Sequence, residues 1–183
     1  MTEPDIIADA SATAGDRLVV TIPGLGEVVG IREGAALAYR GIPFAQPATG
    51  ERRFMLPEPV QPWSGRLDAT ARRPIAPQPA SPSDVMMGAI REPQDEDCLS
   101  LTIWRPETAD SPLPVIAWLH GGGFTSGGGD LPWYDGGTLA AEQGVIVVGI
   151  NYRLGPLGFL HVDGFVSGNL AIQDQQLALE WIR

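Results

Sequence analysis

Residues 115–150, VIAWLHGGGFTSGGGDLPWYDGGTLAAEQGVIVVGI, carry the pattern that decides the fold. Two apolar runs of strand length, Val115–Leu119 and Val145–Ile150, enclose a glycine-rich turn. Between them, Gly137–Gln143 fits a short helix, and Gly144 supplies its stop signal. This order of elements is typical of a parallel α/β sheet, and the continuous hydrophobicity of the runs predicts central strands that are covered on both faces.

The flanking sequence extends this sheet. Leu99–Trp104 is a third run of strand length, and Ala171–Arg183 has apolar residues at helical spacing. Near the start of the chain, three β-like runs separated by glycines predict a small antiparallel meander, and they are Leu18–Ile22, Gly26–Ile31 and Leu37–Ile42. We therefore predict an α/β fold in which a small antiparallel meander is followed by central parallel strands and helices.

Two segments are expected to lack regular structure. Pro43–Pro93 is dense in proline, which removes amide donors and breaks helices, so this segment is predicted to run irregularly over the surface. Residues 1–15 are expected to form a flexible tail. Residues 16–183 would then form one structural unit.

Composition excludes several classes of function. The chain of 183 residues has 12 basic and 22 acidic residues, a net charge of −10, and all its basic residues are arginines. The absence of lysine excludes a P-loop lysine, a Schiff-base lysine and a Ser-Lys dyad. The arginines are scattered, so no nucleic-acid partner is predicted. A single cysteine can form neither an internal disulfide nor a cysteine-rich zinc site.

The N-terminal sequence and the apolar runs bear on localisation. Residues 1–15 contain acidic but no basic side chains and no long apolar stretch, unlike a secretory signal. No run approaches the length of a membrane span. We therefore expect a cytoplasmic protein without a membrane partner.

The turn after Val115–Leu119 is the candidate for chemistry. In open α/β sheets, ligands bind beyond the carboxyl ends of the strands. Gly121, Gly122 and Gly123 allow backbone amides to approach a ligand closely and to stabilise a developing oxyanion. A flexible connector is one alternative. A dinucleotide-binding turn is another, but no acidic residue is evident about 20 residues further on at the end of the next strand.

Five blocks occur in this order along the sequence: Tyr39–Ala45, Glu96–Leu101, His120–Phe124, Asn151–Phe159 and Gly168–Gln175. Together they resemble type-B carboxylesterases, the α/β-hydrolase group that also contains cholinesterases and bacterial para-nitrobenzyl-type esterases. The match extends from about Leu18 to Arg183, and the bacterial branch is the most similar.

The resemblance implies roles for the glycine turn. Gly122 and Gly123 would be catalytic, donating two backbone amides to the tetrahedral intermediate, whereas Gly121 and Phe124 would contact substrate. His120 would support the loop through a hydrogen bond. The implied substrates are small esters with short or aromatic acyl groups, with carbamates or anilides as further candidates, and no metal or organic cofactor is implied.

The family's nucleophile is not found in this sequence. The family uses a serine in a Gly-x-Ser-x-Gly elbow together with an acid and a histidine. The most similar stretch here, Gly123–Gly127, is out of register by one residue, and the family's elbow follows the helix that begins at Ala171. We therefore expect an N-terminal portion that is inactive alone, with the catalytic remainder in a second chain or a continuation. The alternative is a non-catalytic cholinesterase-like interaction protein or a truncated pseudoenzyme.

The resemblance also implies structural roles for three further residues. Arg53 and Glu96 match family positions that form an ion pair tying the proline-rich segment to the core. Cys98 matches a position that is disulfide-bonded in secreted animal members, but Ala76 stands at the partner position. We expect Cys98 to be a small buried thiol.

The remaining titratable groups are given no catalytic role. His161 is expected to be a structural or rim histidine. Solvated or capping positions are expected for the other acids near the site, which are Asp130, Asp135, Asp174 and Glu180.

Overall fold

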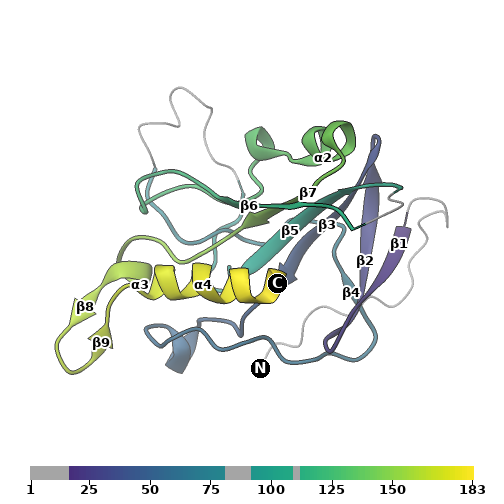
Figure 1. The fold of residues 1–183 in the computed structure, drawn as a ribbon. Helices are drawn as coiled ribbons and strands as arrows, with labels where there is room; N and C mark the ends of the chain where they lie inside the picture. Colours follow the sequence, from purple (N-terminus) through teal and green to yellow (C-terminus); the bar gives the residue numbers. More distant parts are fainter. Residues whose placement is uncertain (1–16, 81–91, 109–111) are drawn as a thin grey trace.

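The computed structural model describes residues 17–80, 92–108 and 112–183, in which a mixed sheet carries helices on both faces (Figure 1). The strand order is β1-β2-β3-β5-β7-β6, and β4 pairs with β2 outside this path. The strands are β1 (Arg17–Ile22), β2 (Gly26–Glu33), β3 (Ala36–Pro43), β4 (Arg66–Asp68), β5 (Ser100–Pro106), β6 (Val115–Leu119) and β7 (Ile146–Ile150).

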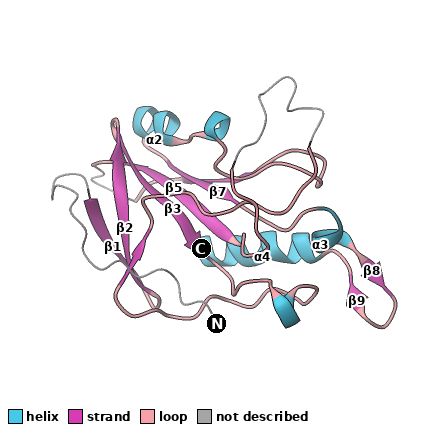
Figure 2. Cartoon of the chain, turned by 180° about the vertical axis from the view of Figure 1, so that it is seen from behind, coloured by secondary structure: helices cyan, strands magenta, loops and turns pink. Residues whose placement is uncertain are grey.

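The main helices lie on opposite sides of this sheet, as the view from behind in Figure 2 also shows. These are α2 (Gly137–Gln143) and α4 (Leu170–Ile182). The smaller elements are η1 (Gly50–Arg52), η2 (Pro132–Tyr134), α3 (Gly155–Phe159) and a hairpin of β8 (His161–Val162) and β9 (Val166–Ser167). In the described residues, no helix has the length and apolar character needed to cross a membrane.

The predicted meander is confirmed. β2 pairs with β1 and β3 in antiparallel fashion, and the turn between β2 and β3 contains Gly34 at φ +60°. The predicted short helix is also confirmed, since α2 ends at Gly144, which has the left-handed conformation typical of a helix C-terminus.

The predicted direction of the central strands is only half right. β6 and β7 are parallel, as the strand-helix-strand pattern predicts, but β5 runs antiparallel to both β3 and β7. The run Leu99–Trp104, expected among the central parallel strands, is therefore antiparallel to both of its neighbours. An apolar run reports burial and contains no information on strand direction.

The two parallel strands differ in how far their side chains are buried. β7 is buried from Val147 onwards, whereas every residue of β6 is exposed. The expectation that both strands are covered on both faces is wrong for β6, since all five of its residues are exposed within the described ranges. Its outer edge is also free there, because only β7 pairs with it.

Because a free apolar edge strand recruits other chains, residues 1–183 in isolation are expected to self-associate. Ile116→Lys, which places a charge on β6, should shift the population toward monomer in sedimentation velocity. Ile172→Lys is the matched control, since Ile172 is an isoleucine of similar exposure on α4 (42% against 40% for Ile116). An Ile116→Lys chain as associated as the control would show that β6 is not the contact.

The proline-rich segment is largely irregular, as predicted, with η1 and β4 as its only regular elements in the described part of Pro43–Pro93. Backbone pairing nevertheless holds it to the sheet, because β4 lies parallel to β2. Cys98, which lies between this segment and β5, is buried and not disulfide-bonded, and burial raises the pKa of its thiol. The predicted tail at residues 1–15 lies outside the described residues.

Candidate active site

The glycine turn lies at the carboxyl end of β6. The backbone here requires glycine, since φ is +117° at Gly122 and +60° at Gly123. An added Cβ at Gly122 would also collide with the Ser126 carbonyl. Phe124 follows at φ +61°, a conformation that is uncommon for a residue with a side chain.

A hydrogen bond from His120 orients the first peptide unit of the turn. His120 Nδ1 lies 2.8 Å from Gly121 O, and because a carbonyl oxygen only accepts, Nδ1 carries the proton. In a trans peptide, the Gly121 carbonyl and the Gly122 N–H point in opposite directions. Fixing the carbonyl therefore fixes the direction of the Gly122 N–H.

The next peptide unit is fixed in the same way. Gly122 O accepts hydrogen bonds from the backbone amides of Thr125 at 3.1 Å and Ser126 at 3.2 Å, and from Thr125 Oγ1 at 3.1 Å. These bonds fix the Gly123 N–H. Within the described part of the chain, neither the Gly122 nor the Gly123 N–H has a hydrogen-bond acceptor.

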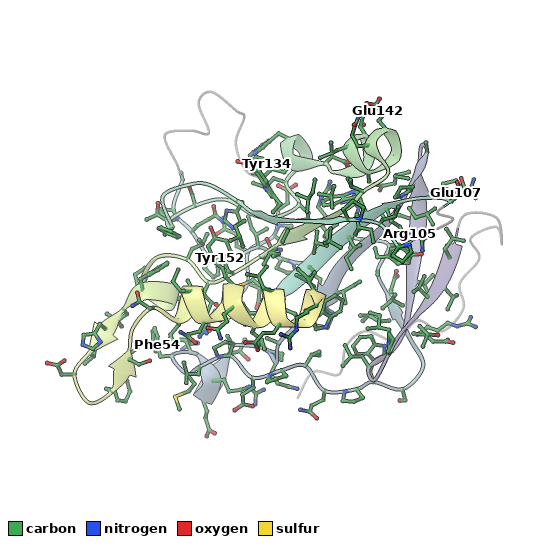
Figure 3. The ribbon with its side chains drawn as sticks, viewed as in Figure 1. Phe54, Arg105, Glu107, Tyr134, Glu142 and Tyr152 are labelled. Atoms are coloured by element: carbon green, nitrogen blue, oxygen red, sulfur yellow. The ribbon has the colours of Figure 1, made fainter. Side chains whose placement is uncertain are left out.

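His120 itself is held by Tyr152, which follows β7 and lies between β6 and α4 in the view of Figure 3. The two rings stack with centroids 4.4 Å apart, and the Tyr152 hydroxyl donates to His120 O at 2.7 Å. Burial lowers the pKa of His120, which favours the neutral ring. The imidazole is thus a structural donor for Gly121 O.

The glycine loop, residues 121–130, begins with the glycine turn, and polar side chains hold its far end in place. Gly129 N donates to Asn151 Oδ1 at 2.7 Å. Asp130 is buried, accepts from Thr102 Oγ1 at 2.9 Å and lies 3.9 Å from the Arg40 guanidinium. Burial raises the pKa of Asp130, and the hydrogen bond from Thr102 opposes this shift. The expectation of a solvated Asp130 is therefore wrong.

Asp174 is also buried rather than solvated, and it forms an ion pair with Arg153. Arg153 Nη2 and Nε donate to the two carboxylate oxygens at 2.6 and 2.8 Å. Arg153 Nη1 reaches the Met55 and Arg53 carbonyls at 2.9 and 3.3 Å. This pair ties α4 to the proline-rich segment, and its importance was missed because 21 residues separate its members.

Arg53 and Glu96 are brought together, with Arg53 Nε 2.7 Å from Glu96 Oε2. Their side chains are 46% and 27% exposed, so solvent screens the pair. Hydrogen bonding to Glu96 raises the pKa of Arg53. The buried connection to the core is made by Arg153 instead.

The other predicted residues lie around the turn or away from it. The Phe124 ring is exposed and lies 5.1 Å from the Phe159 ring. Asp135 accepts from Gly137 N at 2.8 Å and thereby helps to start α2. His161 is exposed beside Asp163, and exposed Glu180 accepts from Gln176 on α4.

Known proteins are similar to this chain in sequence and fold. The family model described as Carboxylesterase family matches residues 16–183. Para-nitrobenzyl esterase of Bacillus subtilis (strain 168) is 47% identical over 163 residues, covering 86% of this chain and 33% of the relative. Acetylcholinesterase of Bungarus fasciatus is 40% identical over 189 residues, covering 98% of this chain and 31% of the relative.

Solved structures agree with this result. A PNB esterase structure superposes with a TM-score of 0.80 at 45% identity, covering 90% of this chain and 33% of that chain. A thermophilic PNB esterase gives a TM-score of 0.81 at 43% identity, covering 90% and 34%. The chain thus spans about a third of the length of these relatives, and its sequence and fold show that it belongs to the carboxylesterase family.

Proposed function

We propose that this chain is the N-terminal portion of a serine carboxylesterase and supplies its oxyanion hole. The observation that supports this most directly is the pair of N–H groups at Gly122 and Gly123. Their peptide units are fixed by hydrogen bonds to the preceding carbonyls, and the N–H groups themselves are unused within the described residues. Donors fixed before the reaction begins cost no reorganisation when charge develops.

The proposed reaction is acyl transfer through an enzyme-bound ester. A serine hydroxyl attacks the ester carbonyl while a histidine accepts its proton, and the carbonyl oxygen becomes an oxyanion that accepts hydrogen bonds from Gly122 and Gly123. Collapse of this intermediate expels the alcohol, which takes the proton from the histidine. Water then releases the acid by the same steps. Serine, acid and histidine are assigned to sequence outside residues 1–183.

The proposed substrate is a small ester with a short or aromatic acyl group. Gly121 would contact the substrate in this proposal, and the space beside it is open, since an added Cβ at this position would have no atom within 4 Å. Phe124 presents an exposed ring beside the turn and would contact the apolar part of the ester. No metal or organic cofactor takes part in the proposed reaction.

The experiment combines residues 1–183 with the catalytic remainder, either co-expressed or as one chain, and this assembly is called the complete esterase below. It should hydrolyse a chromogenic acetate ester, and an organophosphorus probe should label a serine outside residues 1–183. Residues 1–183 alone should neither turn over the ester nor become labelled. Labelling of a serine within this chain would overturn the assignment.

The lowered pKa of His120 leads to a prediction for stability against pH. Since the unfolded chain binds the proton more readily, the stabilising contribution is complete above the ordinary histidine pKa of about 6.5. It should decline as the pH falls through the lower pKa of the folded state. Urea unfolding of the complete esterase should show this decline, and His120→Gln should reduce it. His161→Gln, which removes the exposed histidine, is the control and should leave the decline in place.

A further inference from the structure

The Gln78 side chain connects the proline-rich segment to the glycine loop. Its Oε1 accepts from Gly127 N at 2.6 Å, and its Nε2 donates to Gly127 O at 2.8 Å. One side-chain amide thereby satisfies both backbone groups of Gly127, as a neighbouring strand would do.

The direction of this amide is itself fixed. Nε2 of Gln78 also donates to Ala76 O at 3.0 Å, so the nitrogen lies between two carbonyl oxygens. The backbone amide of Gln78 donates to Gln94 Oε1 at 2.9 Å. Rotating the side-chain amide by half a turn would set its oxygen against both carbonyls, so the observed orientation is the one that satisfies all partners.

Gly127 is packed against the turn that carries the proposed oxyanion donors. An added Cβ at Gly127 would collide with His120 Nδ1 and Gly121 O, the two atoms whose hydrogen bond orients the Gly122 N–H. In the peptide unit before Gly127, the Ser126 carbonyl occupies the space where a Gly122 side chain would lie. The peptide that Gln78 holds therefore lies against both Gly121 and Gly122.

We propose that Gln78 is a positioning residue for the oxyanion hole. It sets the Ser126–Gly127 peptide, and through that peptide the direction of the Gly122 N–H. The inference rests on the proposed function, because it concerns the same two amides. Gln78 touches neither Gly122 nor Gly123 through a hydrogen bond and is not assigned contact with substrate.

The proline-rich segment does not depend on Gln78 for its own place. Ile75 is buried, donates from its backbone amide to Pro93 O at 3.0 Å and accepts from Asp95 N at 3.0 Å. Loss of the Gln78 amide should therefore disturb the glycine loop while the segment stays folded.

The test uses two substitutions at Gln78 in the complete esterase. Gln78→Met keeps the length and volume of the side chain but removes both hydrogen bonds to Gly127. We expect kcat to fall by about 10- to 100-fold, because small displacements of catalytic groups have effects of this size, with KM changed by less than about twofold. Gln176→Met is the matched control, since Gln176 is an exposed glutamine on α4 bonded to Glu180, and it should leave both constants unchanged.

The pH dependence of kcat in Gln78→Glu distinguishes a positioning role of Gln78 from a merely structural one. An ionised carboxylate can accept from Gly127 N but repels Gly127 O, whereas a protonated carboxyl donates to that oxygen. The kcat of Gln78→Glu relative to wild type should therefore rise as the pH is lowered from about 8 to about 5, toward the ordinary glutamate pKa of about 4.3. The same ratio for Gln78→Met should stay flat.

Hydrogen exchange separates this inference from the proposed function. The Gly127 amide should be protected in the wild type and should exchange at least about 10-fold faster in Gln78→Met. If the wild type lacks esterase activity but shows this protection, the proposed function fails and the contact stands. An unprotected Gly127 amide, or unchanged kcat in Gln78→Met and Gln78→Glu at an unchanged Tm, would overturn the positioning role.

Discussion

Gly122→Ala is expected to lower kcat of the complete esterase by about 10²- to 10³-fold, the loss typical of removing one oxyanion donor. The added methyl would collide with the Ser126 carbonyl, and alanine disfavours the φ of +117° at this position. The turn must shift to relieve both problems, which moves the Gly122 N–H away from the reacting oxygen. KM should change much less, because the donor acts mainly in the transition state.

The control for backbone strain is Gly144→Ala. Gly144 has a φ of +63° at the end of α2, and an added Cβ there would have no neighbour within 4 Å. Its substitution imposes a left-handed conformation on alanine without touching the turn, so kcat should stay at the wild-type value. A folded Gly122→Ala enzyme with wild-type kcat would remove Gly122 from the proposed oxyanion hole.

The sequence contains enough local information to place the turn. Val115–Leu119, the glycines after it and the helix ended by Gly144 were all predicted, because strand hydrophobicity and helix stop signals act over a few residues. The direction of β5 was not predictable in this way, since it depends on pairing with β3 and β7 at distant positions in the chain.

The contacts that hold the turn in place were the least predictable. Asp130 follows three glycines and Asp174 lies among glutamines, so neither local sequence indicates a buried ion pair, yet both are buried against arginines. Gln78 lies in a Pro-Gln pair whose sequence gives no indication that Gly127, 49 residues away, is its partner. Such pairs are decided by packing between segments that are distant in the chain, and local sequence patterns do not report that packing.

The pair of Arg153 and Asp174 should dominate the stability of this part of the fold. Asp174→Asn is expected to lower the free energy of unfolding of the complete esterase by about 3–5 kcal/mol, because it leaves the Arg153 charge buried without its counter-ion. Arg153→Met should have an effect of similar size, since it leaves the Asp174 carboxylate unpaired. It also removes the hydrogen bonds that Arg153 donates to the Met55 and Arg53 carbonyls. Urea unfolding of the single and double variants measures both losses and the coupling between the residues.

The exposed pair of Arg53 and Glu96 supplies the comparison. Its hydrogen bond, at 2.7 Å, is about as short as those of the buried pair, so geometry alone would assign the two pairs similar strength. Solvent screens the exposed charges, and removing one leaves the other hydrated, so Glu96→Gln should cost far less than Asp174→Asn. If the two substitutions cost the same, burial would not be the source of the Arg153–Asp174 contribution.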